Sequence, residues 1–198
     1  MSASAEPKAS LRAAEDAPQW LKDHLTMPVV LPVTDGQDGA ALLDAASAVL
    51  GIALTCIRID GVEAGTPFVL PDELLGEARV VRVYVSVCDV PAPAPWDSSS
   101  ELAIQVRTIS NHTVSVACGW DTTVKEFCED VNEAFGFERS ARIKLGCMGA
   151  RKIVACCRGA CTRTSNMPLR FVRGVREALL APPDEPIVYC VHNYGPGG

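Results

Sequence analysis

A proline- and serine-rich segment divides this chain of 198 residues almost in the middle. It runs from 89 to 100 and reads DVPAPAPWDSSS, with alternating prolines ahead of a run of serines. Alternating prolines hold a chain extended and serine runs leave it loose, so this composition is typical of a linker. A chain of this length can bury two modest cores. We therefore expect one domain at 26–88, a linker at 89–100 and a second domain at 101–198.

The first 25 residues are rich in alanine, serine and charged side chains without a period, and we expect a mostly disordered arm. They lack the apolar core of a secretory signal, and no apolar run in the chain approaches the length of a bilayer span. The net charge of -6 and the pI near 5.1 argue against nucleic acid or an anionic membrane as partner. Both of these bind clustered lysine and arginine. We expect a cytosolic protein.

The second half predicts a hairpin followed by a helix. Residues 102–108 and 114–118 alternate between apolar and polar, and Asn111 between them tolerates the left-handed conformation that such turns require. Thr123 and Glu126 have the spacing of a capping box. One face of the helix that follows carries the apolar residues Val124, Phe127, Val131 and Phe135. The helix should stop at Gly136, and further strands are predicted at 142–145 and 187–191.

The first half predicts a blurred version of the same plan. Residues 29–33 alternate as a strand, 38–50 form a helix, 57–59 a short strand and 81–87 a last strand. The helix should turn four apolar residues inward, namely Leu42, Ala45, Ala46 and Val49. The matching order predicts an internal duplication, although no strand ahead of residue 29 is visible in the sequence.

The second half resembles ubiquitin. Residues 106–116 (VRTISNHTVSV) are similar to the first hairpin of that family, 121–126 (DTTVKE) to its helix start and 142–146 (RIKLG) to its third strand. Residues 51–52 and 57–61 resemble the same region in the first half, and the chain ends in Gly197-Gly198. Together these features resemble the two-domain ubiquitin-like modifiers of antiviral defence, both the interferon-induced kind of vertebrates and those of bacterial antiphage operons. The resemblance implies an α+β chain of two tandem β-grasp domains, each a mixed sheet curled around one helix.

The resemblance also implies how such a protein acts. The carboxylate of Gly198, preceded by Gly197, would be adenylated, passed to a cysteine thiolate and joined to an amine of a target protein. The implied partners are an activating enzyme, a conjugating enzyme, a deconjugating protease and the targets. The protein itself would be a substrate rather than an enzyme and would need no cofactor. The sequence leaves open whether Gly198 is encoded as the last residue or exposed by proteolysis.

The tail departs from the family pattern. Tyr194, Gly195 and Pro196 precede the two glycines where the family usually carries arginine. Pro196 fixes its own φ and biases Gly195 toward an extended shape, so the tail is partly stiffened. We expect recognition of these three residues by a dedicated activating enzyme.

The apolar recognition patch of ubiquitin is altered as well. The resemblance places Ile109, Lys144 and His192 at this partner surface in the second half, with Arg58 at the equivalent of Lys144 in the first. Interface cores are depleted in charged residues, so general ubiquitin receptors should bind this surface poorly.

Other chemistry is weakly indicated. The nine cysteines are an odd number and define no complete disulfide framework. Cys156, Cys157 and Cys161 lie close together, but their spacing is not that of a zinc site and no histidine is near, so we predict no metal. The three histidines are isolated and fit surface or turn positions better than catalytic ones: His24, His112 and His192.

Three alternatives to conjugation remain open. A sulfur carrier shares the fold and the di-glycine ending and uses a C-terminal thiocarboxylate, although such carriers are normally single domains. A scaffold would bind partners through its two domains without being conjugated. The two glycines could also be a frayed end without a chemical role.

Overall fold

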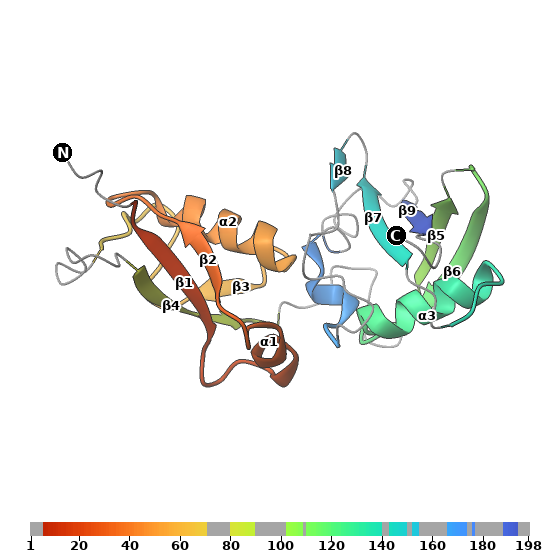
Figure 1. The fold of residues 1–198 in the computed structure, drawn as a ribbon, viewed down its shortest axis with the longest axis horizontal. Helices are drawn as coiled ribbons and strands as arrows, with labels where there is room; N and C mark the ends of the chain where they lie inside the picture. Colours follow the sequence, from red (N-terminus) through yellow and green to blue (C-terminus); the bar gives the residue numbers. More distant parts are fainter. Residues whose placement is uncertain are drawn as a thin grey trace. The chain divides into compact units, whose positions relative to one another are not determined.

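The computed structural model describes residues 6–70, 80–89, 102–108, 110–139, 143–149, 152–154, 166–173, 176 and 188–193. The chain is of the α+β class and divides into two compact units (Figure 1). One unit comprises Met1–Ala48 with Leu54–Asp89, and the other comprises Val49–Ala53 with Val90–Gly198. The linker predicted at 89–100 lies, apart from Asp89, outside the described residues.

The first unit is built on a mixed four-stranded sheet. Its elements are β1 (Lys8–Ala13), α1 (Gln19–His24), β2 (Val29–Pro32), α2 (Gly39–Leu50), β3 (Ile57–Ile59) and β4 (Val80–Val87). The strand order is β2-β1-β4-β3, with β1 antiparallel to β2 and parallel to β4. Strand β3 is antiparallel to β4. The first and last strands of the unit are therefore neighbours in the middle of the sheet.

The expectation of a mostly disordered arm through residue 25 is wrong for the described residues of that stretch. Strand β1 has a hydrogen-bonded neighbour on each side, and Ala9 and Leu11 are fully buried. Ser10 between them is also buried, although residues 8–13 (KASLRA) alternate between polar and apolar. Strand β1 is therefore the missing first strand of this half, for which the sequence analysis made no prediction.

Helix α2 confirms part of the predicted inward face. Leu42 and Ala46 are fully buried, as expected, but Val49 is 41% exposed. Leu50 is buried in place of Val49. Since residues four apart lie on one side of a helix, the true inward row is 42, 46 and 50.

The second unit repeats this plan with one strand more. Its elements are β5 (Leu102–Thr108), β6 (Thr113–Cys118), α3 (Val124–Ala134), β7 (Ile143–Gly149), β8 (Lys152–Val154), the 3-10 turn η2 (Leu169–Phe171) and β9 (Val188–Asn193). The strand order is β6-β5-β9-β7-β8. Strand β5 is antiparallel to β6 and parallel to β9, and β7 is antiparallel to both β8 and β9.

The predicted hairpin and helix of this half are confirmed. Asn111 has a φ of 66° in the hairpin turn, and Gly136 ends α3 with a φ of 73°. The side chain of Thr123 accepts from the Glu126 amide, and the Glu126 carboxylate accepts from the Thr123 amide, which completes the capping box. Val124, Phe127 and Val131 are buried on the face expected for them.

The two units share their register as well as their order. Leu11 pairs with Val29 in the first hairpin, and Val106 pairs with Val114 in the second. Gly51 and Gly136, 85 residues apart, both end their helices with positive φ. A residue with a side chain adopts this conformation at a cost, so the same stop signal serves both helices.

The loop before each helix is held by a three-residue segment from later in the chain. We call these two segments, Thr66–Phe68 and Met167–Leu169, the proline straps, because each has proline in the middle. In the first unit, Gly39 donates its amide to the Thr66 carbonyl at 2.9 Å, and Phe68 donates to the Gln37 carbonyl at 2.7 Å.

The second unit makes the same two hydrogen bonds. Val124 donates to the Met167 carbonyl at 2.9 Å, and Leu169 donates to the Thr122 carbonyl at 2.8 Å. Gly39 and Val124 are again 85 residues apart. Each strap thus satisfies an amide that the first turn of a helix leaves without an intrahelical partner.

Candidate functional site

The predicted conjugation site follows the last strand of the second unit. Strand β9 ends at Asn193. Tyr194, Gly195, Pro196, Gly197 and Gly198 lie outside the described residues. Strand β9, which precedes these residues, is a middle strand of the sheet and pairs with β5 on one side and β7 on the other.

The predicted partner-surface residues fall at matching places in the two sheets. Arg58 is exposed on β3 and is the Cα partner of Ser86 on β4. Lys144 on β7 is the Cα partner of His192 on β9. The structure therefore brings Lys144 and His192 together in the second sheet and puts Arg58 at the equivalent position of the first. Ile109 lies outside the described residues.

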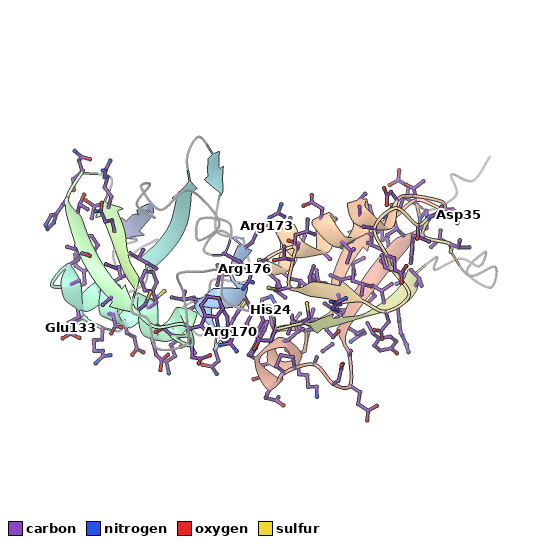
Figure 2. The ribbon with its side chains drawn as sticks, turned by 180° about the vertical axis from the view of Figure 1, so that it is seen from behind. His24, Asp35, Glu133, Arg170, Arg173 and Arg176 are labelled. Carbon is purple, nitrogen blue, oxygen red and sulfur yellow. The ribbon has the colours of Figure 1, made fainter. Side chains whose placement is uncertain are left out.

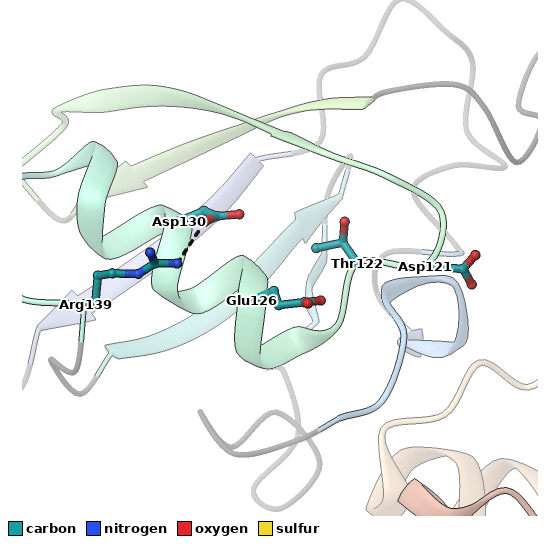
Figure 3. Close-up of a pocket in the computed structure, with 5 residues that line it drawn as sticks. All are labelled: Asp121, Thr122, Glu126, Asp130 and Arg139. Atoms are coloured by element: carbon teal, nitrogen blue, oxygen red, sulfur yellow. Dashed lines mark ion pairs between the residues drawn. The ribbon is translucent and has the colours of Figure 1, made fainter.

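An open hollow lies beside the start of helix α3. A cavity of about 490 Å³ there is lined by Asp121, Thr122, Glu126, Asp130 and Arg139 (Figure 3). Its lining holds three carboxylates and one guanidinium, so the cavity disfavours anionic ligands.

Two interactions position the side chains of this cavity. Glu126 accepts hydrogen bonds of 2.8 Å from the amide and from the hydroxyl of Thr123. These bonds, the backbone one foremost, lower the pKa of Glu126. Arg139 lies 3.3 Å from a carboxylate oxygen of Glu129 and 3.8 Å from one of Asp130. Burial raises the pKa of Asp130, although the nearby Arg139 lowers it.

Two arginines that follow the strap of the second unit contact the loop before α3. Arg170 forms an ion pair with Asp121, and its guanidinium lies 4.8 Å from the ring centre of Phe171. The buried Arg176 places its guanidinium 5.7 Å from the ring centre of Trp120. Arg176 also donates a hydrogen bond of 3.5 Å to the carbonyl oxygen of Arg170, and both arginines are labelled in Figure 2. The contacts to Asp121 and Trp120 tie the segment after the strap to the loop before α3.

The described residues show no arrangement typical of nucleophilic or metal catalysis. No group of three or more histidine, cysteine or acidic side chains within the described ranges could hold a metal ion. His112 lies in the turn expected for it and packs edge-on against Phe135, with ring centres 5.5 Å apart. His24 is half-buried, which lowers its pKa. The cluster of Cys156, Cys157 and Cys161 lies outside the described residues.

Cys88 and Cys118 are free thiols. Burial, together with the charge of Asp130, raises the pKa of Cys118 to about 12. A thiol of such high pKa carries almost no thiolate at neutral pH and is therefore a poor nucleophile.

Sequence reasoning missed the proline straps. The signal was present as two tripeptides, Thr66-Pro67-Phe68 and Met167-Pro168-Leu169, each with an apolar residue after proline. They escaped notice because the distance from helix to strap differs between the two halves, so a fixed repeat period does not align them.

Comparison with known proteins found neither a matching family nor a curated protein of significant sequence similarity. Across the described part of the chain, none of the helices combines the length and the apolar character that a membrane crossing demands.

Proposed function

We propose that this protein is a ubiquitin-like modifier with two tandem β-grasp domains, joined through the carboxylate of Gly198 to amines of target proteins. The observation that supports it best is the shared topology of the two units. Each has a hairpin, then a helix, then further strands, with the first and last strands parallel at the middle of the sheet. This shared order supports the β-grasp fold that the ubiquitin resemblance implies.

The duplicated register also explains why only one of the two units would be joined to targets. Val87 and Asn193 occupy equivalent positions. Val87 pairs with Ile57, the first residue of β3, and Asn193 pairs with Ile143, the first residue of β7. Beyond Val87 the chain continues as CDVPA, whereas beyond Asn193 it reads YGPGG. Only the second sequence is free of side chains at the position where an enzyme channel must pass the tail.

The proposed chemistry needs little from the modifier itself. A carboxylate is a poor acylating agent, so a partner enzyme must adenylate Gly198 with ATP, which releases pyrophosphate. Its own cysteine thiolate then takes the acyl group and releases AMP. The amine of a target then displaces the thiolate and forms an amide. In this proposal the folded units are recognition handles for enzymes of the cytosol, and the protein is their substrate.

The decisive experiment uses the tail sequence itself. An affinity-tagged form ending at Gly198, produced in its native cells and purified under denaturing conditions, should yield adducts of higher mass. Chymotrypsin cleaves after tyrosine, so cleavage after Tyr194 should leave Gly-Pro-Gly-Gly attached to the modified lysine of each target. Deletion of Gly197 and Gly198 should abolish these adducts.

A matched control keeps the tail and alters the surface. Lys125 is exposed on α3, and Lys125→Ala should leave the adducts unchanged. Absence of any Gly-Pro-Gly-Gly remnant from the intact form would refute conjugation. The intact mass of the recovered free protein separates the other candidates. A sulfur carrier would show oxygen replaced by sulfur at the terminus, and a scaffold would show neither change.

A further inference from the structure

We propose that the outer face of the first sheet is a docking surface for an acidic segment of a partner protein. The face is defined by the strand register, since residues directly opposite one another on neighbouring strands lie on the same side of a sheet. The buried side holds Ala9, Leu11, Val83 and Val85, which face the core. The residues that alternate with them make up the outer face.

The outer face collects four cations: Lys8, Arg12, Arg58 and Arg82. Lys8 is opposite Val80, Arg12 opposite Tyr84 and Arg58 opposite Ser86, while Arg82 is opposite Ser10. Three of the cations are exposed, and Arg12 is half-exposed. No acidic residue occupies any outward position of these four strands, although the chain has 24 acidic residues against 18 basic ones. Because acidic residues outnumber basic ones in the whole chain, a face with four basic residues and no acidic one departs from the average composition.

Apolar side chains lie among these cations. Val30 is 48% exposed, Val80 39% and Tyr84 45%. All three are on the outer face, because Val30 is opposite Ser10 and the other two are opposite Lys8 and Arg12. Apolar anchors of this kind supply binding energy at protein interfaces, and surrounding charges supply orientation and specificity.

The second unit shows that the fold does not require these cations. Ser10 pairs with Arg82 as Gln105 pairs with Val188, and Arg12 pairs with Tyr84 as Arg107 pairs with Cys190. Thus valine replaces Arg82 and cysteine replaces Tyr84 in the second sheet.

The hairpin register extends the comparison. Lys8 pairs with Pro32 as Ala103 pairs with Ala117, so alanine replaces Lys8. Only Arg107 and Lys144 preserve charge, at the positions of Arg12 and Arg58. Two of the four cations are therefore absent from the second sheet, so the full set belongs to the first unit and is not required by the shared fold.

An acidic protein segment fits this face better than the other polyanions. Single-stranded nucleic acid is held by several aromatic side chains along a basic groove, whereas the face has one tyrosine. The surface of an anionic membrane acts on the charge of the whole molecule, and the net charge of -6 opposes binding to it. A short segment with glutamates and a large apolar residue matches the four cations and the patch around Tyr84. This inference does not depend on the conjugation of Gly198.

The test measures the anisotropy of a fluorescein-labelled peptide, Glu-Glu-Asp-Leu-Glu-Trp-Glu-Glu, titrated with the full chain. The double variant Lys8→Ala/Arg82→Val takes the residues that the second unit carries at these positions, so it should fold. It should weaken binding roughly tenfold, as expected for the loss of two charge pairs. Tyr84→Ala should weaken binding as well. Arg107→Ala, which removes the cation equivalent to Arg12 from the second unit, should leave binding unchanged.

Three outcomes would overturn the proposal. The first is no binding of the peptide at low salt by the intact protein. The second is an equal loss of binding in Arg107→Ala and in the double variant, which would show a general response to charge. The third is tighter binding to a thymine oligonucleotide or to phosphatidylserine vesicles than to the peptide. A circular dichroism spectrum of each variant, compared with that of the intact protein, establishes that any loss is one of contact and not of folding.

Discussion

The amide of Gly39 donates a hydrogen bond of 2.9 Å to the carbonyl oxygen of Thr66, and the approach of the two segments leaves no room for a side chain at residue 39. A Cβ atom there would lie 2.2 Å from the carbonyl oxygen of Glu63. That neighbour is backbone, which cannot rotate away as the end of a side chain can. The first unit therefore requires glycine at this position for space and not for an unusual φ.

The substitution Gly39→Ala should destabilise the first unit by about 1–3 kcal/mol, the usual cost of forcing an extra group into a packed site. Urea denaturation followed by circular dichroism measures the change. Gly119→Ala is the control, because its Cβ would meet only the Thr122 hydroxyl at 3.7 Å. Equal stability of the two variants would show that the strap of the first unit yields without cost.

The capping box of α3 should also have a measurable effect on stability. Thr123→Ala removes the oxygen that accepts from the Glu126 amide at 3.2 Å and should cost about 0.5–2 kcal/mol. Hydrogen exchange of the α3 amides should rise in this variant. Lys125→Ala changes an exposed residue of the same turn and should leave exchange in α3 unaltered. Unchanged exchange in Thr123→Ala would mean that the strap alone holds the helix start.

The parts of the fold that the sequence could predict are those with a local signal. Thr123 and Glu126 mark the start of α3, and Gly136 marks its end. Both signals can be read from the sequence because they depend only on neighbours within one turn. The β5–β6 hairpin was equally plain because one of its faces is buried and the other exposed. Its alternation follows directly from that half-burial.

Strand β1 was missed although its six residues, KASLRA, alternate between polar and apolar in the same way. Ser10 is 6% exposed although it points to the outer face, and Ala9 and Leu11 on the other face are 0% exposed. Two of its three inward residues are alanine, which is depleted in strands and gives a weak apolar signal, so the alternation did not stand out from the alanine- and serine-rich residues around it. The basic outer face of the first sheet shows a second limit. The resemblance singled out Arg58, whereas Lys8, Arg12 and Arg82 join it only through the pairing of strands distant in sequence.

The stability of the first unit should depend on pH through Asp38. One carboxylate oxygen of Asp38 accepts hydrogen bonds of 2.9 Å from the amides of Ala40 and Gly65, and these bonds lower its pKa below the ordinary 3.8. A lowered pKa in the folded state means that the unfolded chain binds the proton more readily. The stabilisation is therefore complete above pH 3.8 and is lost as the pH falls from there through the folded pKa.

The variant Asp38→Asn tests this sign. Asparagine also caps helices well but has no charge to lose, so its stability should not follow this titration. The intact protein should be the more stable of the two at pH 7, and the difference should shrink below pH 3.8. Urea denaturation of both forms at a series of pH values measures it. A difference that grows on acidification would contradict the assignment.

Thiol reactivity should separate the described cysteines in the folded protein. Cys118 is 5% exposed and its pKa is raised to about 12, so both access and thiolate content are low. Cys88 is half-exposed and should react first with iodoacetamide at pH 8. Mass spectrometry of peptides after timed alkylation measures the order, and alkylation in guanidinium, where every thiol is accessible, provides the reference rates. Because the raised pKa follows from burial first and from Asp130 second, Asp130→Asn should leave Cys118 protected as long as the fold persists. Modification of Cys118 as fast as Cys88 in the native protein would mean that the sheet and α3 open readily around it.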